Sequence, residues 1–179
     1  MRNRGMSRIA AHRGFTLVEL MLVIMVIGVM TALAIPGLQK MTARARRAEM
    51  TGTLGRMHLY FVNLYENQGN FCPPDLTCTG PFTSVLNPTS NLPVGQAAPW
   101  DQKSPGWASL PFYPDGGVRM RYQFIANGST LTLKVYGAFP GLPSLGVIPG
   151  TAFDHSYEYT ETFLGTTLDV NNILETPSF

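Results

Sequence analysis

The sequence predicts an α+β protein in which a long N-terminal α-helix, with a transmembrane first half, packs on a small antiparallel β-sheet head. Three observations favour this fold class. Residues 15–35 are apolar apart from one carboxylate. Residues 38–65 repeat apolar positions at spacings of three and four, which is typical of a helix with one buried face. Residues 118–163 contain segments in which apolar and polar side chains alternate, as they do in half-buried strands.

Residues 1–14 form a basic leader. The leader contains four arginines and no acidic residue, whereas the whole chain has 13 Lys and Arg against 11 Asp and Glu. Because Lys and Arg beside a membrane span remain cytoplasmic, we expect the leader in the cytoplasm and the C-terminal bulk of the chain on the other side of the membrane. Without the leader the net charge becomes negative, so the charge balance predicts no nucleic-acid partner.

The apolar run at residues 15–35 has the length of a membrane span, which needs about 20 residues as a helix. The small residue Gly14 precedes this run, whereas a secretory signal peptide has small residues after its apolar region. Cleavage after Gly14 would therefore leave the apolar helix on the product. A carboxylate such as Glu19 inside a span costs roughly 2.5–3.5 kcal/mol, and we expect the new amine of Phe15, on the same or a neighbouring chain, to offset it.

The segment GFTLVEL at residues 14–20 closely resembles the class III signal of type IV pilins and related pseudopilins. That family has a basic leader, a glycine, Phe-Thr-Leu-[Ile/Val]-Glu and a hydrophobic helix, and Pro36 stands where the family places a proline. The resemblance covers residues 8–50. It implies the pilin fold and a prepilin peptidase that cuts between Gly14 and Phe15 and methylates the Phe15 amine, which then pairs with Glu19 of a neighbouring subunit.

The long helix contains two predicted weak points. Pro36 has no backbone N–H, which predicts a kink, and Gly28 destabilises the helix by about 1 kcal/mol relative to Ala. The resemblance implies that residues 28–36 can lose helicity in an assembled filament; a plain proline kink is the alternative. The amphipathic half is expected at residues 37–68, ending near the stop signal Asn67–Gly69. Its expected buried positions are Leu38, Met41, Ala45 and Ala48, followed by Leu54, Met57, Phe61, Leu64 and Tyr65.

Residues 69–117 are rich in Pro, Gly, Ser and Asn, which predicts a loop region at the start of a head domain covering residues 69–179. Cys72 and Cys78 are the only cysteines, and an oxidising compartment favours a disulfide between them. One helical turn is expected at Thr83–Leu86. Large residues bury much area, and those expected to anchor the end of the loop on the core are Trp107, Leu110 and Phe112.

Residues 118–179 are expected to form the sheet. Val118–Ile125 alternates apolar and polar side chains, and the Asn127-Gly128 pair predicts a hairpin turn into a return strand at Thr130–Ala138. A third strand is expected at residues 155–163 and a short fourth at Thr166–Val170. The economical arrangement is an antiparallel meander that covers one face of the helix.

The sequence offers no pattern typical of catalysis. Its three histidines, His12, His58 and His155, lie in no metal-ligand spacing and pair with no nucleophile, and no phosphate-binding glycine motif occurs. We therefore expect no enzyme activity, no cofactor and no metal. Secretion pseudopilins usually carry a calcium loop, and the residues that would supply oxygens to one here are Asp154, Glu158, Glu161 and Asp169.

The predicted function is that of a structural subunit of a type IV pilus. The expected partners are a prepilin peptidase and methyltransferase, an inner-membrane assembly platform, other pilins of a homo- or hetero-oligomeric filament, and the membrane. The resemblance implies that the protein first crosses the bacterial inner membrane once, with its C-terminal head in the periplasm, and then becomes part of the cell-surface pilus. A type II secretion pseudopilin and a minor pilin whose head binds DNA or a surface remain alternatives. Three arginines between the apolar positions are expected on a solvated or inter-subunit face: Arg44, Arg46 and Arg47.

Overall fold

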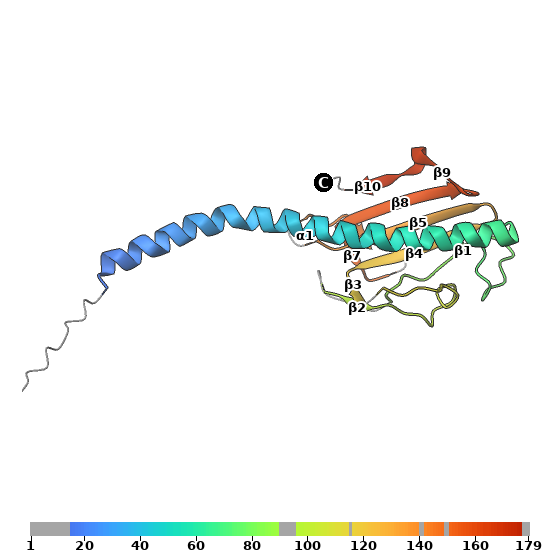
Figure 1. Cartoon of the computed structure of the whole chain (residues 1–179), viewed down its shortest axis with the longest axis horizontal. Helices are drawn as coiled ribbons and strands as arrows, with labels where there is room; N and C mark the ends of the chain where they lie inside the picture. The colour runs from blue at the N-terminus through green and yellow to red at the C-terminus, as the bar shows by residue number, and fades with distance from the viewer. Residues whose placement is uncertain (1–14, 90–95, 115, 140–141, 149–150, 177–179) are drawn as a thin grey trace, which may run out of the picture. The chain divides into compact units, whose positions relative to one another are not determined.

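The computed structural model describes residues 15–89, 96–114, 116–139, 142–148 and 151–176. The chain divides into two compact units, residues 1–40 and residues 41–179. One long helix, α1 (Leu17–Gln68), begins in the first unit and continues in the second. The second unit also contains the strands of the head (Figure 1).

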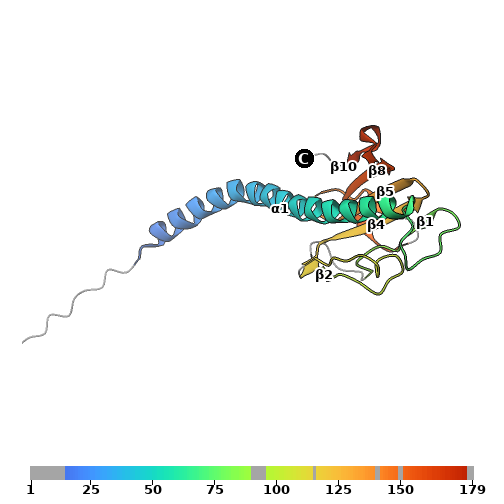
Figure 2. The same ribbon diagram turned by 45° about the vertical axis from the view of Figure 1, so that its right-hand side comes forward.

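Helix α1 ends where the sequence offers glycine. Gly69 has a φ of 70°, and its backbone N–H donates to the Tyr65 carbonyl at 2.7 Å. A glycine with positive φ satisfies a terminal carbonyl without steric strain, which explains why the helix stops at Gln68. Within the second unit, one face of α1 lies on the sheet (Figures 1 and 2), and its buried residues are Ala43, Arg46, Met50, Thr53, Leu54, Met57, Phe61 and Leu64.

The buried face of α1 corrects part of the predicted stripe. Leu54, Met57, Phe61 and Leu64 are buried as predicted, but the four earlier positions are exposed. Those exposed positions are Leu38, Met41, Ala45 and Ala48. The buried stripe instead continues backwards through a charged position, Arg46, and this is possible because the aliphatic stem of arginine packs against apolar surface. A pattern based on apolar residues alone therefore selects the neighbouring face of the helix.

Three long antiparallel strands form the centre of the sheet, and they confirm the predicted meander. The strands are β4 (Met120–Asn127), β5 (Thr130–Gly137) and β8 (Tyr157–Leu164). The full order is β1-β4-β5-β8-β10, with β9 (Thr167–Leu168) also paired to β8. The edge strands are short: β1 (Phe82–Thr83) and β10 (Leu174–Thr176). The alternation of β4 is confirmed, because Met120, Tyr122 and Phe124 are buried towards α1.

Asn127 pairs with Thr130, so the turn between β4 and β5 consists of Gly128 and Ser129, one residue later than the predicted pair. Gly128 has a φ of 54°, which a glycine adopts without strain. Two further small sheets join β2 (Ala98–Pro99) to β3 (Gly117–Val118) and β6 (Gly146–Val147) to β7 (Asp154–His155). A single 3₁₀ turn, η1 (Val170–Asn172), precedes β10.

The helical turn predicted at Thr83–Leu86 is wrong. Phe82 and Thr83 pair with Ala126 and Ile125 of β4, and the Ser84 N–H donates to the Phe124 carbonyl at 2.9 Å. The segment is extended because it hydrogen-bonds to the otherwise unpaired edge of β4. The two segments lie about forty residues apart in the sequence, so no local sequence pattern predicts this pairing.

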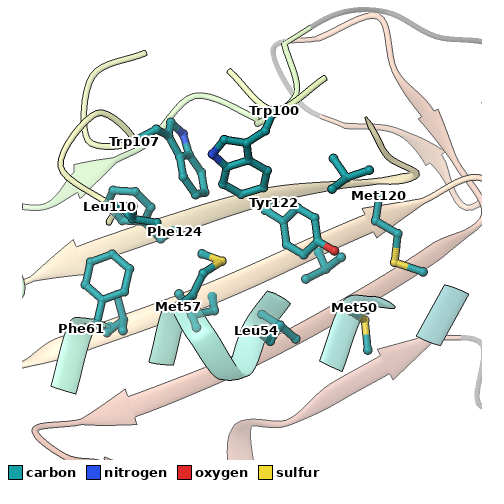
Figure 3. Packing of buried hydrophobic residues seen from close by; sticks show 14 of the residues in the cluster. Met50, Leu54, Met57, Phe61, Trp100, Trp107, Leu110, Met120, Tyr122 and Phe124 are labelled. Atoms are coloured by element: carbon teal, nitrogen blue, oxygen red, sulfur yellow. The ribbon is translucent and has the colours of Figure 1, made fainter. Parts of the chain in front are cut away.

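The hydrophobic core lies between α1 and β4, and Figure 3 shows Met57 and Phe61 of the helix facing Tyr122 and Phe124 of the strand. The loop supplies two indoles to the same core. Trp107 lies 5.1 Å from the Phe124 ring between centroids, and Trp100 lies 5.6 Å from the Tyr122 ring. The Trp107 Nε1–H donates to the Val85 carbonyl at 2.9 Å. The predicted anchors are thus confirmed: Trp107 and Leu110 are buried, and Phe112 is partly buried against them.

The predicted disulfide is confirmed, because Cys72 and Cys78 are bonded, with their Cα atoms 5.9 Å apart. The small loop that it closes is fastened to the rest of the head. The Gly106 N–H donates to the Asp75 carboxylate at 2.8 Å, and the Phe71 N–H donates to the Gly128 carbonyl at 3.1 Å. The disulfide loop is therefore held from both sides.

Candidate functional site

The candidate site is the apolar first part of α1. Every residue from 15 to 42 is exposed, and between Phe15 and Gln39 the only ionisable side chain is Glu19. By length and composition, α1 is a helix that could cross a membrane. Such a surface is stable only when lipid or other apolar helices cover it. The site is therefore a helix that requires an apolar environment and contains one carboxylate.

Glu19 closes a capping box at the start of α1. The Thr16 backbone N–H donates to Glu19 Oε2 at 2.9 Å, and the Thr16 hydroxyl donates to the same oxygen at 2.8 Å. In return, the Glu19 N–H donates to the Thr16 hydroxyl oxygen at 3.3 Å. This is the reciprocal arrangement of Thr at the N-cap and Glu three residues later, and it satisfies two backbone donors that have no partner inside the helix.

The capping box was missed in the sequence, although Thr16-Leu17-Val18-Glu19 has the S/T-x-x-E spacing that indicates one. It supplies a local reason for Glu19 at this position. Among the described residues, however, the structure gives Glu19 Oε1 no hydrogen-bond partner, so the carboxylate retains an acceptor that a cation can use. Phe15 is described and exposed, whereas Gly14, the expected cleavage position, lies outside the described residues.

Gly28 and Pro36 both lie in the interior of α1, and the helix continues through each of them. No atom outside the local helix backbone lies within 4 Å of where a Cβ of Gly28 would be. The Thr31 hydroxyl donates to the Ile27 carbonyl at 2.7 Å, a back-bond that is common for Thr inside helices. The predicted loss of helicity between Gly28 and Pro36 concerns the filament and stays a prediction.

One turn of α1 fastens three separate parts of the head. Arg46 Nη1 donates to the Ala138 carbonyl at 3.0 Å, and its guanidinium lies 5.1 Å from the centre of the Phe139 ring. Arg47 forms an ion pair with Glu175 of β10. Glu49 accepts the Arg119 backbone N–H at 2.9 Å and pairs with the Arg119 guanidinium at 3.4 Å.

These contacts correct the prediction for two of the three arginines. Arg44 is exposed as expected, but Arg46 is only 8% exposed and Arg47 is paired with the C-terminal strand. Burial, with a smaller effect of the Arg119 charge, lowers the pKa of Arg46 from its ordinary value. The arginines therefore hold the head on the helix, and no sequence signal distinguishes this role from a solvated face.

The described residues contain no group of three or more His, Cys, Asp or Glu side chains placed to hold a metal ion. His58 stacks on Phe163 with ring centroids 4.4 Å apart, and burial lowers its pKa. Glu161 lies buried on the helix-facing side of β8, where it accepts the Tyr159 hydroxyl at 3.2 Å. Burial raises the pKa of Glu161, and the hydrogen bond from Tyr159 opposes that rise.

Comparisons with known proteins give one family match, which lies in the same N-terminal segment, and several similar proteins. A family described as the prokaryotic N-terminal methylation motif matches residues 9–35. The chain is 34% identical over 87 residues to the fimbrial protein EcpC of Eikenella corrodens, which is 49% of this chain and 56% of that protein. It is 35% identical over 81 residues to the type IV major pilin protein PilE1 of Neisseria gonorrhoeae, 45% of this chain and 46% of that protein.

A third relative, the type IV major pilin protein PilA of Myxococcus xanthus, is 43% identical over 47 residues, 26% of this chain and 21% of that protein. The chain thus spans about half the length of the first curated relatives that it matches. No solved structure matches. The chain thus carries a prokaryotic N-terminal methylation motif, folds as a helix on a sheet, and is similar over at most about half of its length to fimbrial proteins and type IV pilins.

Proposed function

We propose that this chain is the precursor of a structural subunit of a type IV pilus filament. A prepilin peptidase hydrolyses the peptide bond between Gly14 and Phe15 and the new Phe15 amine is methylated. Before assembly the apolar part of α1 spans the inner membrane with the head on the periplasmic side. An inner-membrane platform then transfers the subunit into a filament in which the apolar helices pack together and the heads form the outer surface.

The observation that carries this proposal is the single carboxylate in an exposed apolar helix. Residues 17–38 are mainly aliphatic and all exposed, so their burial in lipid or among other helices is favourable. Glu19 opposes that burial, because leaving a buried ion without its partner costs roughly 3–5 kcal/mol. The Phe15 amine of a neighbouring subunit relieves this cost, since methylation of an amine retains its positive charge.

Pairing of this kind also selects one register between subunits. A subunit that docks one step out of place leaves an unpaired carboxylate and an unpaired ammonium in an apolar environment. The repulsive cost of wrong docking, more than the attraction in the correct one, is what gives such a pair its specificity. Apolar packing of the helices supplies the cohesion.

The capping box gives Glu19 a second, competing role, and the two roles can be separated by substitution. Glu19→Gln retains the oxygen that accepts the Thr16 bonds, because Gln serves as well as Glu in a capping box, but it removes the charge. Glu19→Ala removes both. If the charge pairs with a neighbouring subunit, the two variants fail alike; if only the cap matters, Gln behaves as wild type.

The experiment expresses the full chain and each variant in source cells that lack their own copy. Membrane fractions are tested for the mature chain by mass of the N-terminal peptide, and sheared surface filaments are tested for the protein by immunoblot. We expect both variants to be inserted and cleaved, and both to be absent from filaments. A normal filament yield with Glu19→Gln would refute charge pairing.

Processing has its own test. We expect Gly14→Leu to block cleavage, because a peptidase subsite that accepts glycine excludes a branched side chain, while insertion of the apolar helix continues. Wild-type protein should yield a peptide that begins at methylated Phe15. Mature-length protein from the Gly14→Leu variant would contradict the proposed cleavage position.

A further inference from the structure

The head begins very close to the residue at which the apolar segment of α1 ends. Lys40 is the first ionisable side chain after Glu19, and Ala43, three residues later, is already buried in the core of the head. Three steps of 1.5 Å along a helix amount to about 4.5 Å, a limit that the length of the chain alone imposes. The polar layer on each side of a bilayer is roughly 5–8 Å thick. With the apolar segment in the bilayer, as proposed above, this end of the head therefore lies at the level of the lipid headgroups.

An uncharged loop, residues 142–147, is fastened to this end of the head. The Leu142 N–H donates to the Phe139 carbonyl at 3.3 Å, and the Leu142 side chain packs against the main core. Arg46 holds the preceding residues, because its guanidinium donates to the Ala138 carbonyl. The loop continues into β6, which pairs with β7 towards the end of the second unit that α1 enters (Figure 1). The 142–147 loop is therefore held beside the first turns of α1 within the head.

The outward side chains of this loop are aliphatic. Val147 is 57% exposed and Leu145 is 43% exposed, and Pro143 is exposed as well. The next residue, Ile148, points the other way and is buried in a second, smaller core. Because residues 142–147 contain no charged side chain, their transfer from water to the boundary of a bilayer carries no ionic desolvation cost and buries apolar surface.

The charges around this end of the head leave a cation available. Acidic side chains here are engaged within the head: Glu49 with Arg119, Glu175 with Arg47, and Asp154 with the Ser144 hydroxyl. Arg44, in contrast, is exposed and forms no ion pair among the described residues. Aliphatic side chains beside a basic one are the combination that binds the surface of an anionic bilayer.

We propose that the head rests on the periplasmic surface of the inner membrane through the 142–147 loop before the subunit enters a filament. Leu145 and Val147 enter the boundary between headgroups and acyl chains, and Arg44 lies against the phosphate of an anionic phospholipid. This inference rests on the membrane-spanning helix of the proposed function and adds a second membrane contact, made by the head. Transfer into a filament then requires the release of this contact as well as the extraction of α1.

The test measures the quenching of tryptophan fluorescence in the full chain, reconstituted into vesicles of phosphatidylethanolamine and phosphatidylglycerol. The quencher is a brominated phosphatidylcholine whose bromine atoms lie either near the headgroup end of the acyl chain or near its middle. Val147→Trp reports on the loop, and Val26→Trp reports on the spanning helix. The unsubstituted chain gives the background, which is low because Trp100 and Trp107 are buried.

Leu164→Trp is the matched control for the loop. Leu164 is 54% exposed, close to the value of Val147, but it lies at the other end of the head. The next residue, Gly165, marks this position, because a Cβ there would lie 3.5 Å from the ring of Tyr65 near the C-terminal end of α1. Should Val147→Trp fail to fold, Leu145→Trp provides the same measurement from the same loop.

We expect the shallow bromine atoms to quench Val147→Trp at least about twofold more strongly than Leu164→Trp, since a docked side chain lies about 5–10 Å into the boundary layer. Adding Arg44→Gln should lower the ratio of docked to free heads about fivefold, the equivalent of about 1 kcal/mol for one basic side chain at an anionic surface. Replacing phosphatidylglycerol by phosphatidylcholine should have a similar effect. Arg56→Gln, also exposed but further along α1, should change nothing.

Two results would overturn this inference alone. The first is equal quenching of Val147→Trp and Leu164→Trp while the deep bromine atoms still quench Val26→Trp, which would leave the 142–147 loop to water or to a neighbouring subunit. The second is a Val147→Trp signal that responds neither to Arg44→Gln nor to the loss of phosphatidylglycerol. A lack of quenching of Val26→Trp would instead refute the membrane-spanning helix itself, and the docking of the head with it.

Discussion

Phe61 offers the sharpest test of how the head is held on α1. Its side chain is fully buried, and its ring lies 4.9 Å from the Phe124 ring and 6.4 Å from the Phe71 ring between centroids. Two positions earlier on the same helix, Leu59 is 64% exposed. The two residues therefore differ in burial while sharing a helix and an apolar character.

The expected effect of Phe61→Ala follows from this burial. A buried aromatic ring removes roughly 150–250 Å² from water, and at about 25 cal/mol per Å² the whole side chain contributes about 4–6 kcal/mol. Because the β-carbon remains and the neighbours relax only partly, we expect a loss of about 3–5 kcal/mol in the free energy of unfolding. Leu59→Ala should change it by less than about 0.5 kcal/mol.

The assay is urea unfolding of the full chain in detergent micelles, followed by tryptophan fluorescence. Trp107 reports directly, because its ring contacts Phe124, which contacts Phe61. Should Phe61→Ala leave no folded head, Phe61→Leu provides a measurable variant with an expected loss of about 1 kcal/mol. A Phe61→Ala loss below about 1 kcal/mol, or an equal loss for Leu59→Ala, would refute the placement of this helix face.

Three further predictions concern the head. Burial raises the pKa of Glu161 above that of the unfolded carboxyl, which is about 4.3. Between these two pKa values the folded state keeps a proton that the unfolded state has released, so the free energy of unfolding falls as the pH rises from the unfolded to the folded pKa. Glu161→Gln should remove this fall and be more stable than wild type at neutral pH in urea titrations; an unchanged pH slope would contradict it. A double-mutant cycle on Arg47→Ala and Glu175→Ala should give a coupling free energy of about 0.5–1 kcal/mol, because both side chains are partly exposed. A coupling of zero would show that this ion pair does not help to hold β10 on α1. Replacing Cys72 and Cys78 together by serine should lower the free energy of unfolding by about 2 kcal/mol, as reduction of the wild type should; equal stability of oxidised and reduced protein would oppose this.

The elements that local chemistry specifies were predictable from the sequence. The alternation in Met120–Asn127 and the glycine at the following turn indicate a hairpin without any knowledge of its neighbours. Likewise, the spacing of Leu54, Met57 and Phe61 indicates the face of α1 that is buried. In each case the periodicity of the backbone and one buried surface decide the outcome.

The short strands were not predictable in the same way. β1, which was predicted as a helical turn, is extended because two residues satisfy the edge of β4. Strands of two or three residues such as β10 have too few positions to show an alternation, and their hydrogen bonds come from segments far along the chain. Their conformation depends on which sheet edge lies within reach.

In the candidate site, too, some features follow from one continuous stretch of sequence and others from tertiary packing. The sequence by itself determined the apolar segment, its single carboxylate and the methylation motif, because length, hydropathy and residue order are properties of one continuous stretch. Only the tertiary structure decided that Arg46 is buried and that Glu161 lies on the helix-facing side of β8. These residues are separated in sequence and are brought together only when the sheet packs on α1, so their environments are set by packing and not by neighbouring residues in the chain.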